Sequence, residues 1–474
     1  MTEAAVPLHP AASARRLLLP LALAQFICSF AGSNMNVMIN DISEDLDTTV
    51  KGVQTTITLF LLIMAILMIP GSKLTDRWGR KRCFMLGLTL YGIGALLSAV
   101  APNLGVLILG NSVLEGVGTA LLIPPVYILA TLWFSDLTTR AWAFGAISGL
   151  GGIGAAAGPL IGGVITTAIS WRAAFVFQVL VIVTIILLSR KITDPIPPDP
   201  TRPFDIVGAV LSGVGMFCIV FGILQAGTNN TLLIIFLVIG AVFLLAFFFY
   251  IRSRERSGKE PLLSTGLFKN RVCNLALATQ NVQWLVLMGT SFVVSVYLQE
   301  VRGYSAIKTG VVFTAATLGI LASSLAAEKL ARKFSQKTLI VAGFVVTVAG
   351  IGLLIGLVPN WSTDWAFVPG LLLVGLGLGT MLTPSVNVVQ SSFPEEQQGE
   401  ISGLSRSVSN LGSSFGTAIA GTILVSAVAS GNRAYAAAMA TVALFGVIGL
   451  VAALFLPSRL GRGASDAPPQ TRGT

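Results

Sequence analysis

Fourteen stretches of this sequence are each long and apolar enough to cross a lipid bilayer as a helix. A spanning helix needs about 20 consecutive, mostly apolar residues. The stretches cover residues 17–39, 52–70, 83–101, 104–133, 141–168, 171–189, 206–226, 231–251, 274–298, 306–327, 338–358, 365–390, 400–428 and 434–456. Only 11% of the 474 residues are charged, whereas soluble domains average about 25%. We therefore predict an all-α membrane protein with 14 transmembrane helices.

Two polar linkers divide the chain. They cover residues 191–205, rich in Pro that cannot continue a helix, and residues 252–271, and they bracket the seventh and eighth stretches. We predict a six-helix bundle over residues 1–190, linkers with two extra transmembrane helices over 191–273, a second six-helix bundle over 274–458, and a disordered cytoplasmic tail over 459–474. The two extra helices are almost purely apolar, which is typical of helices that face lipid.

Basic residues orient the helices, because cytoplasmic loops are enriched in Lys and Arg. If both termini are cytoplasmic, only five of the 30 basic residues fall on the outer side, namely Lys51, Arg172, Arg302, Lys308 and Arg433. We therefore expect a multi-pass protein of the plasma or inner membrane with both termini and the loop Ser72–Arg82 in the cytoplasm.

Composition excludes several classes of function. His9 is the only histidine and the four cysteines stand singly, so we expect neither a metal site nor a cofactor. The basic residues do not gather on a soluble face, as nucleic-acid binding requires. Paired catalytic acids, an activated Ser or Cys, and a phosphate-binding P-loop are all missing. The expected partners are the lipid bilayer and a small-molecule substrate, with no nucleic acid, and we expect a monomer that is not an enzyme.

Polar side chains recur on one face of the first stretch. Gln25, Ser29, Ser33 and Asn36 follow one another at spacings of three or four residues, which places them on one side of a helix. Because polar atoms are costly against hydrocarbon, this face lines either a central cavity or a seam between helices. The other candidate cavity-lining residues are Ser112, Gln280, Asn281, Gln283, Trp284 and Asn387. A neutral polar cavity with one acid favours an amphipathic or cationic substrate.

Glu115 is the one carboxylate well inside a predicted span. An ionisable group at membrane depth is costly enough to suggest a function, so Glu115 is our candidate for proton coupling. The alternative is that Glu115 only forms a hydrogen bond to a neighbouring helix.

Two motifs and a weak internal repeat carry a family resemblance. The loop SKLTDRWGRKR, residues 72–82, has a degenerate partner in AEKLARKFSQK, residues 327–337. The fifth stretch carries a glycine-rich motif made of Gly154, Gly158, Pro159, Gly162 and Gly163. In this order on fourteen spans, these features resemble the major facilitator superfamily and, within it, the fourteen-helix drug and proton antiporters.

The resemblance implies two six-helix bundles and a secondary active transporter that exports small amphipathic or cationic compounds by alternating access, coupled to protons. It also implies a conformational latch in the basic loop, made of Asp76, Arg77, Gly79 and Arg80 with Asp136, in which Asp76 caps a facing helix. The other interpretation of this loop is a topology signal alone.

Two positions depart from the family pattern. Ala31 and Ser112 stand where members of the family typically carry an Asp in the first helix and an Arg in the fourth. An alternative function therefore stays open, namely a uniporter or importer of a small metabolite or lipid without standard proton coupling.

We predict that a single cysteine introduced at Arg82, at the end of the loop Ser72–Arg82 in an otherwise cysteine-free protein, is not labelled by a membrane-impermeant maleimide added to intact cells. The same cysteine should react once the cells are opened. Labelling of intact cells would reverse the predicted orientation.

Overall fold

The computed structural model describes residues 11–134, 137–190, 192–194, 197–361, 363–393, 397–426 and 431–457, and no strand occurs among them. Thirteen helical spans in this part of the chain are long and apolar enough to cross a membrane. The helix α7 (Leu137–Ala168) supplies the fourteenth when its two parts, bent by 45°, are counted as one span. The predicted all-α membrane fold is confirmed.

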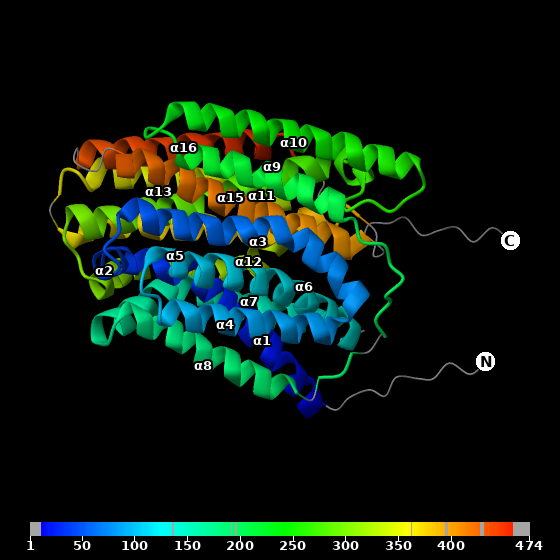
Figure 1. Cartoon of the computed structure of the whole chain (residues 1–474). Coiled ribbons are helices and arrows are strands. Elements are labelled where there is room, and N and C mark those ends of the chain that lie inside the picture. The colour runs from blue at the N-terminus through cyan, green and yellow to red at the C-terminus, as the bar shows by residue number, and fades with distance from the viewer. Residues whose placement is uncertain are drawn as a thin grey trace, which may run out of the picture.

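The spans form two bundles that lie side by side (Figure 1). The first contains α1 (Ala11–Asn34), η1 (Met35–Met38), α2 (Ile39–Asp45), α3 (Val50–Trp78), α4 (Arg80–Ala99), α5 (Leu104–Leu107), η2 (Ile108–Glu115), α6 (Gly116–Trp133), α7 and α8 (Trp171–Ser189). The second contains η3 (Thr265–Lys269), α11 (Arg271–Val296), η4 (Tyr297–Val301), α12 (Ala306–Lys333), α13 (Gln336–Leu357), η5 (Asp364–Ala366), α14 (Val368–Gln390), α15 (Gln398–Ser426) and α16 (Asn432–Leu454).

The helix packing of the first bundle is repeated in the second. The pairs α1 with α7, α4 with α6, α3 with α6 and α4 with α8 correspond to α11 with α15, α13 with α14, α12 with α14 and α13 with α16. An internal repeat of this kind is common in transporters, where it places the substrate site between the halves.

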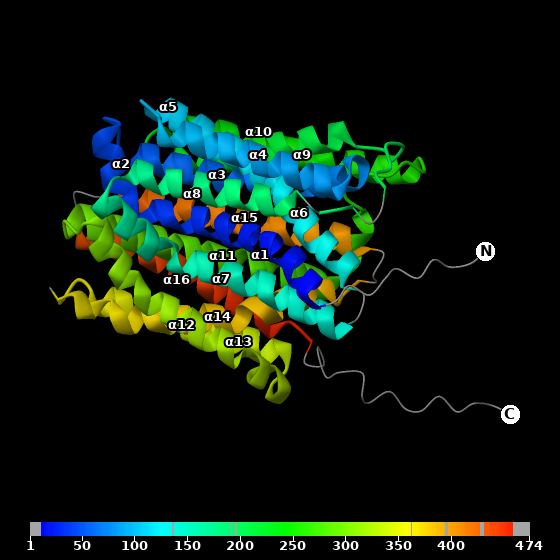
Figure 2. The ribbon, with the colours of Figure 1, turned by 90° about the horizontal axis from the view of Figure 1, so that it is seen from below.

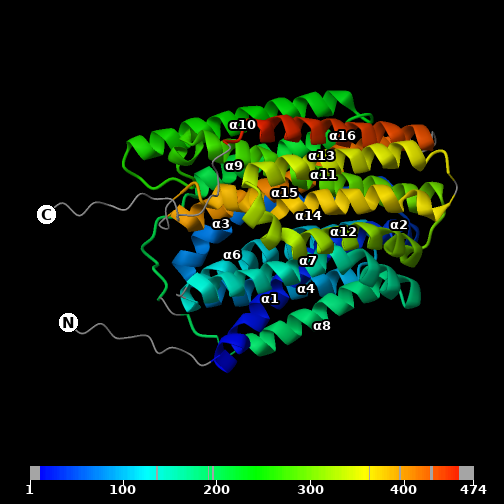
Figure 3. The same cartoon turned by 180° about the vertical axis from the view of Figure 1, so that it is seen from behind.

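The two bundles touch along two helix pairs. Figure 2 shows α3 next to α15, and Figure 3 shows α7 next to α12. The first pair is held by polar contacts to backbone: Gln54 donates from its side-chain amide to the carbonyl of Thr417 (3.0 Å), and Ser414 donates to that of Thr58 (3.1 Å). These contacts satisfy polar groups that would otherwise face hydrocarbon.

The helices α9 (Ile206–Leu224) and α10 (Asn230–Arg256) form a hairpin outside the two bundles. The helix α9 packs on both α3 and α15, where Val220 and Leu224 form a small apolar cluster with Leu62 and Ala418. In contrast, α10 contacts α9 and buries only Gly240 and Ile251 among its residues. The hairpin therefore covers one side of the seam between the bundles.

The first span is longer than the sequence predicts. It ends at Asp45 rather than at residue 39, because η1 and α2 continue the helix through three acidic residues. The last of them, Asp45, accepts hydrogen bonds from the indole of Trp171 (3.1 Å) and from Arg172 at the start of α8. A partner from a distant part of the chain thus keeps this acidic turn helical.

The two ends of the molecule differ. The helices α3 and α16 both end on the side where α1 begins (Figure 1), and we call this side the basic end because Arg80, Arg202 and Arg254 lie there. The opposite side, which holds α2 and η4, is called the far end.

Glycines of α7 permit its close approach to α1. A Cβ added at Gly154 would lie 2.3 Å from the carbonyl oxygen of Phe26, and one at Gly158 would lie 2.0 Å from the Oγ of Ser33. Small residues allow helix backbones to approach closely in a membrane, where packing and not the hydrophobic effect holds helices together.

We predict that Gly154→Ala destabilises the folded protein by about 1 to 3 kcal/mol, because the methyl group has no space against the α1 backbone. At Gly152, on the same helix, a Cβ would meet no described atom within 4 Å, so Gly152→Ala should leave the melting temperature in detergent unchanged or raised. Equal melting temperatures for the two variants would contradict the close contact.

Candidate functional site

Arg406 on α15 lies deep between the two bundles. Its neighbour Ser407 donates a hydrogen bond to the carbonyl of Ala65 (2.5 Å), near the middle of α3. Ala65 stands about 20 Å along the helix from Trp78 at the end of α3. The predicted span of α3 ends at residue 70, about 7.5 Å from Ala65, so Arg406 lies within the membrane-spanning part of the protein, nearer to the basic end.

A chain of polar contacts runs from Arg406 into the first bundle. The guanidinium donates to the hydroxyl of Tyr127 on α6 and lies 4.8 Å from the centre of its ring. That hydroxyl donates to the amide oxygen of Gln25 on α1 (3.2 Å), and the amide nitrogen of Gln25 donates to Ser29 (3.2 Å). The side chains of three helices from both bundles thus meet at one site.

Open space adjoins this network on α1. A Cβ built at Gly32, one turn beyond Ser29, would meet no described atom within 4 Å, and both residues are partly exposed. The helix α1 packs against α6, α7 and α8, and the space at Gly32 is at least large enough for a methyl group.

Gln25 and Ser29 are among the candidate cavity-lining residues predicted from the sequence, whereas Tyr127 and Arg406 are not. The signal for Arg406 was present, since it is the one charged residue of the predicted span 400–428 apart from Glu400 at its first position. A charge at this depth is costly and is normally paired or functional.

Three other predicted cavity residues of the first bundle lie in packing seams. Ser33 donates to the carbonyl of Phe30 (3.2 Å) and rests against Gly158. Ser112 donates to the carbonyl of Thr56 on α3 (2.7 Å). Asn36 lies in η1, and its own carbonyl accepts a hydrogen bond from Gln299 of η4 (2.8 Å).

The polar residues of α11 separate onto two sides. Gln280 exchanges hydrogen bonds with Ser409 (2.9 Å) and Ser405 (3.0 Å), and Asn281 donates to the carbonyl of Val408 (2.9 Å), so both join α11 to α15. Gln283 lies about 200° around the helix from Asn281. Its amide nitrogen and oxygen are buried and have no hydrogen-bond partner among the described residues, which is typical of a group that meets water or a ligand.

The last two predicted cavity residues are placed differently. Trp284 is half-buried on α11, and Asn387 is exposed near the end of α14. Neither side chain has a hydrogen bond to a described residue of the polar network around Arg406.

Two adjoining grooves run along the outer side of α11. One, of about 300 Å³, lies between α9, α11, α15 and α16, and the other, of about 440 Å³, extends toward η3. Both include Asn281 and Val282, and their other lining residues are almost all apolar. These grooves are lateral and separate from the site at Arg406.

Glu115 is fully buried inside the first bundle. It ends η2, which is a turn of wide π-helix, a form often found at functional positions. The carboxyl group accepts hydrogen bonds from Ser98 on α4 (3.4 Å) and from Asn111 (3.3 Å). No basic side chain among the described residues lies within 4 Å of it.

The far end is closed between the bundles. Gln299 of η4 accepts a hydrogen bond from the backbone of Asn40 (3.1 Å), in addition to its contact with Asn36. At the other helix pair, the backbone of Ile307 donates to Thr167 (3.1 Å), and Gly163 rests on the carbonyl of Ala306. The rest of the glycine-rich motif also packs in seams, with Gly162 against Asn34 and Pro159 against Gly310.

The basic loop after α3 binds the first linker. Asp76 forms ion pairs with Arg80 (2.9 Å) and with Arg202 (2.9 Å), and Gly79 reverses the chain with φ = 95°. The backbone amides of Arg80 and Lys81 at the start of α4 donate to Asp194 of the linker (2.6 and 3.3 Å). The acid at a helix amino terminus in this conformation is therefore Asp194. Arg77 is half-buried, and the predicted partner Asp136 lies outside the described residues.

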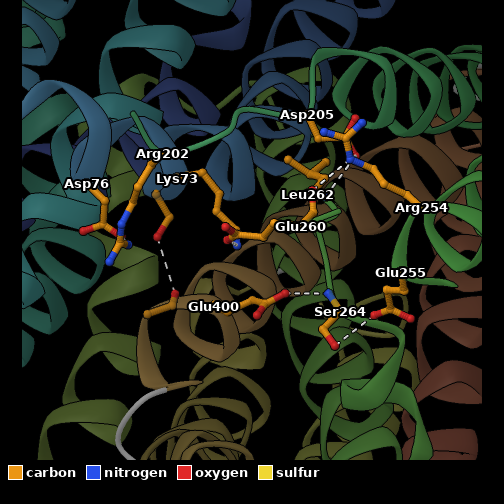
Figure 4. Close-up of polar contacts among 12 residues, drawn as sticks. Lys73, Asp76, Arg202, Asp205, Arg254, Glu255, Glu260, Leu262, Ser264 and Glu400 are labelled. Atoms are coloured by element: carbon orange, nitrogen blue, oxygen red, sulfur yellow. Dashed lines mark hydrogen bonds and ion pairs between the residues drawn. The ribbon is translucent and has the colours of Figure 1, made fainter. Parts of the chain in front are cut away.

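Figure 4 shows how the second linker joins both bundles at the basic end. Lys73 of α3 pairs with Glu260 (2.8 Å), and Glu400 of α15 accepts from the backbone of Ser264 (2.5 Å). Asp205 holds the two linkers together, since it accepts hydrogen bonds from Tyr250 and from the backbone of Leu262 (each 3.0 Å). Arg254 lies 3.8 Å away.

Comparison with known proteins shows one family. The model of the Major Facilitator Superfamily matches residues 21–268, 204–417 and 282–473. The puromycin resistance protein pur8 of Streptomyces alboniger is 29% identical over 87% of this chain and 82% of its own length. The multidrug efflux pump LfrA of Mycolicibacterium smegmatis is 29% identical over 77% of this chain and 72% of its own length.

A solved structure has the same fold. The peptide transporter POT, in a mutant form in complex with alafosfalin, superposes with a TM-score of 0.71 over 97% of this chain and 98% of its own. The sequence identity is 16%, so the likeness concerns the fold alone.

We predict that Asp205→Ala destabilises the protein by about 2 kcal/mol, because it removes the cap of α9 and leaves the buried amide of Leu262 without an acceptor. Thermal unfolding in detergent measures the effect. The matched change Asp199→Ala, at an exposed acid of the same linker, should leave the melting temperature unchanged, and an equal loss for both would contradict the role of Asp205.

Proposed function

The chain belongs to the Major Facilitator Superfamily, and from this premise we propose that it exports small amphipathic compounds across the membrane by alternating access. As a member of the family, it is a multi-pass membrane transporter of small molecules. The export of drugs is supported by the names of the similar proteins, a puromycin resistance protein and a multidrug efflux pump. The observation in this chain that carries the proposal is the polar site shared by Gln25, Tyr127 and Arg406 of both bundles.

Alternating access requires that contacts at one end of the bundles break while those at the other form. The hydrogen bonds of Gln299 with Asn36 and Asn40 are suited to breaking, since each is a single contact at the far end. We propose that the outward-open state lacks them. We propose that the conformational latch around Asp76 takes part in the same change between inward-open and outward-open states. As the linker moves, Asp76 releases Arg202 and binds another partner.

We propose that the basic end faces the cytoplasm. The support is the distribution of Lys and Arg, of which only five in 30 fall on the other side. Export then runs from the basic end to the far end. Since one chain contains both bundles and the site between them, we propose that it works as a monomer.

Glu115 is the proposed proton-binding group. Its carboxyl is fully buried and is contacted by neutral donors, so a negative charge there is costly and binding of a proton relieves the cost. Its position in a wide helical turn gives the segment a way to change shape when the proton binds or leaves.

A uniporter without proton coupling is the second candidate function. Two observations favour it: Ser112 is engaged with Thr56 in a packing seam, and Glu115 faces α4 instead of the site at Arg406. The two functions differ in whether protons move with the substrate.

We predict that substrate added to proteoliposomes with a pH gradient stimulates proton flux, and that Glu115→Gln abolishes this stimulation while keeping downhill substrate exchange. The amide preserves the shape and most hydrogen bonds of the carboxyl but cannot take up a proton. A pH-sensitive dye inside the vesicles measures proton flux.

The control is Asp47→Asn, the same acid-to-amide change at an exposed residue between α2 and α3, which should leave proton flux as in the parent. Parent-like coupling in the Glu115→Gln protein would assign Glu115 a structural role. Substrate movement without proton flux in the parent itself would favour the uniporter.

A further inference from the structure

Among the described residues, no acidic side chain is paired with the positive charge of Arg406. A guanidinium stays protonated in proteins, and within a membrane span such a charge is normally paired with another charged group or with backbone carbonyls. No carboxylate of the described residues lies within 4 Å of Arg406. Its neighbours are neutral, namely the ring and hydroxyl of Tyr127.

The hydrogen-bonding capacity of Arg406 is also largely unused. A guanidinium has five N–H donors, and among the described residues only the hydroxyl of Tyr127 accepts from it. The remaining donors form the flat fork that recognises a carboxylate with two parallel hydrogen bonds.

The buried acid of the spans does not serve as the counter-ion. Glu115 is held by Ser98 and Asn111 between η2 and α4, and no ion pair joins it to Arg406. The charge that faces the space between the bundles is therefore positive. The sequence-based expectation was a neutral cavity with one acid, which favoured amphipathic or cationic substrates.

We propose that Arg406 binds a carboxylate group of the transported molecule, so that the substrates are amphipathic anions. The inference rests on the proposed export of amphipathic compounds and names the class of substrate. The carboxylate meets the fork of Arg406 on the second bundle, and the body of the molecule extends along Tyr127 toward Gln25, Ser29 and the open space at Gly32 on the first.

A ligand held in this way touches both bundles at once. Arg406 belongs to α15, whereas Tyr127 and Gln25 belong to α6 and α1, and Figure 2 shows these three helices near one another. The carboxylate of the ligand also supplies a negative charge next to Arg406, which has no counter-ion among the described residues. Both effects favour a state in which the bundles close around the substrate.

Binding of three matched probes tests the proposal. The probes are 11-(dansylamino)undecanoic acid, its methyl ester, and the analogue with a trimethylammonium group in place of the carboxylate. Their binding to the full-length protein is measured by dansyl fluorescence in nanodiscs of phosphatidylcholine, whose lipids carry no net charge. The parent should bind the acid about tenfold to a hundredfold more tightly than the ester or the cation, as expected for a charge-assisted hydrogen-bonded pair.

Variants separate recognition from packing. Arg406→Gln should remove the preference for the acid, and Arg406→Lys, which keeps the charge but not the fork, should retain part of it. Tyr127→Phe keeps the ring and should keep the preference. The control Arg256→Gln removes one positive charge from the exposed end of α10 and should bind like the parent.

Several outcomes would overturn the proposal. These are equal or weaker binding of the acid by the parent, an unchanged preference in Arg406→Gln, and binding of none of the probes. If Arg406→Gln does not fold, the preference of the parent for the acid and the binding by Arg406→Lys still test the proposal.

Transport of the three probes in proteoliposomes is measured as a separate experiment. Binding of the acid without export would contradict the proposed function and leave the anion site intact, whereas export of all three probes alike would contradict only the site.

Discussion

The close approach of helix backbones at glycine positions is the contact on which the rest of this structure depends. Inside a bilayer there is no water to drive apolar helices together, so they are held by packing and by hydrogen bonds between polar groups. Gly154 rests on the backbone of α1 within the first bundle, and Gly412 and Gly416 rest on that of α11 within the second. Gly163 does the same across the seam with α12. The same kind of contact thus builds each bundle and joins the two, and the repeated pairing of helices follows from it.

Such packing leaves little room for polar side chains. Those that are present fall into two groups, according to whether they lie in a seam between helices or next to open space. Ser112 and Gln280 donate hydrogen bonds to a neighbouring helix, and Ser33 packs against Gly158 of α7, so all three lie in seams between helices. Gln25, Tyr127 and Arg406 instead join side chains from both bundles next to open space. The second group includes a charge without a counter-ion among the described residues, and this imbalance makes the site one for a ligand. The polar residues that carry the transport proposal are therefore those whose contacts are incomplete.

The linkers give the extra hairpin a structural role. Asp205 caps α9 and also accepts from Tyr250 of α10 and from the second linker, so one buried carboxylate holds three segments. From there, Lys73 and Glu400 connect the second linker to α3 and to α15. The helix α9 then lies over the seam between these two helices. The hairpin is attached to both bundles at their basic end, and any relative movement of the bundles must move or strain these contacts.

The sequence by itself determined the membrane fold, because apolar stretches of sufficient length have few other stable structures in which their backbone hydrogen bonds are satisfied. It also predicted a division into two bundles and a hairpin, since prolines and charges interrupt the apolar pattern at the linkers. It indicated that Gln25 and Ser29 share a face, because helical spacing is regular.

Only the tertiary structure decided which polar faces meet an open site and which meet another helix. The spacing of Ser33 and the position of Ser112 are those of cavity residues, yet Ser33 packs against Gly158 of α7 and Ser112 donates to Thr56 of α3, so both lie in seams. The pairing of Arg406 with Tyr127, 279 positions apart, depends on how the two bundles are placed against each other, and no local pattern encodes that distance.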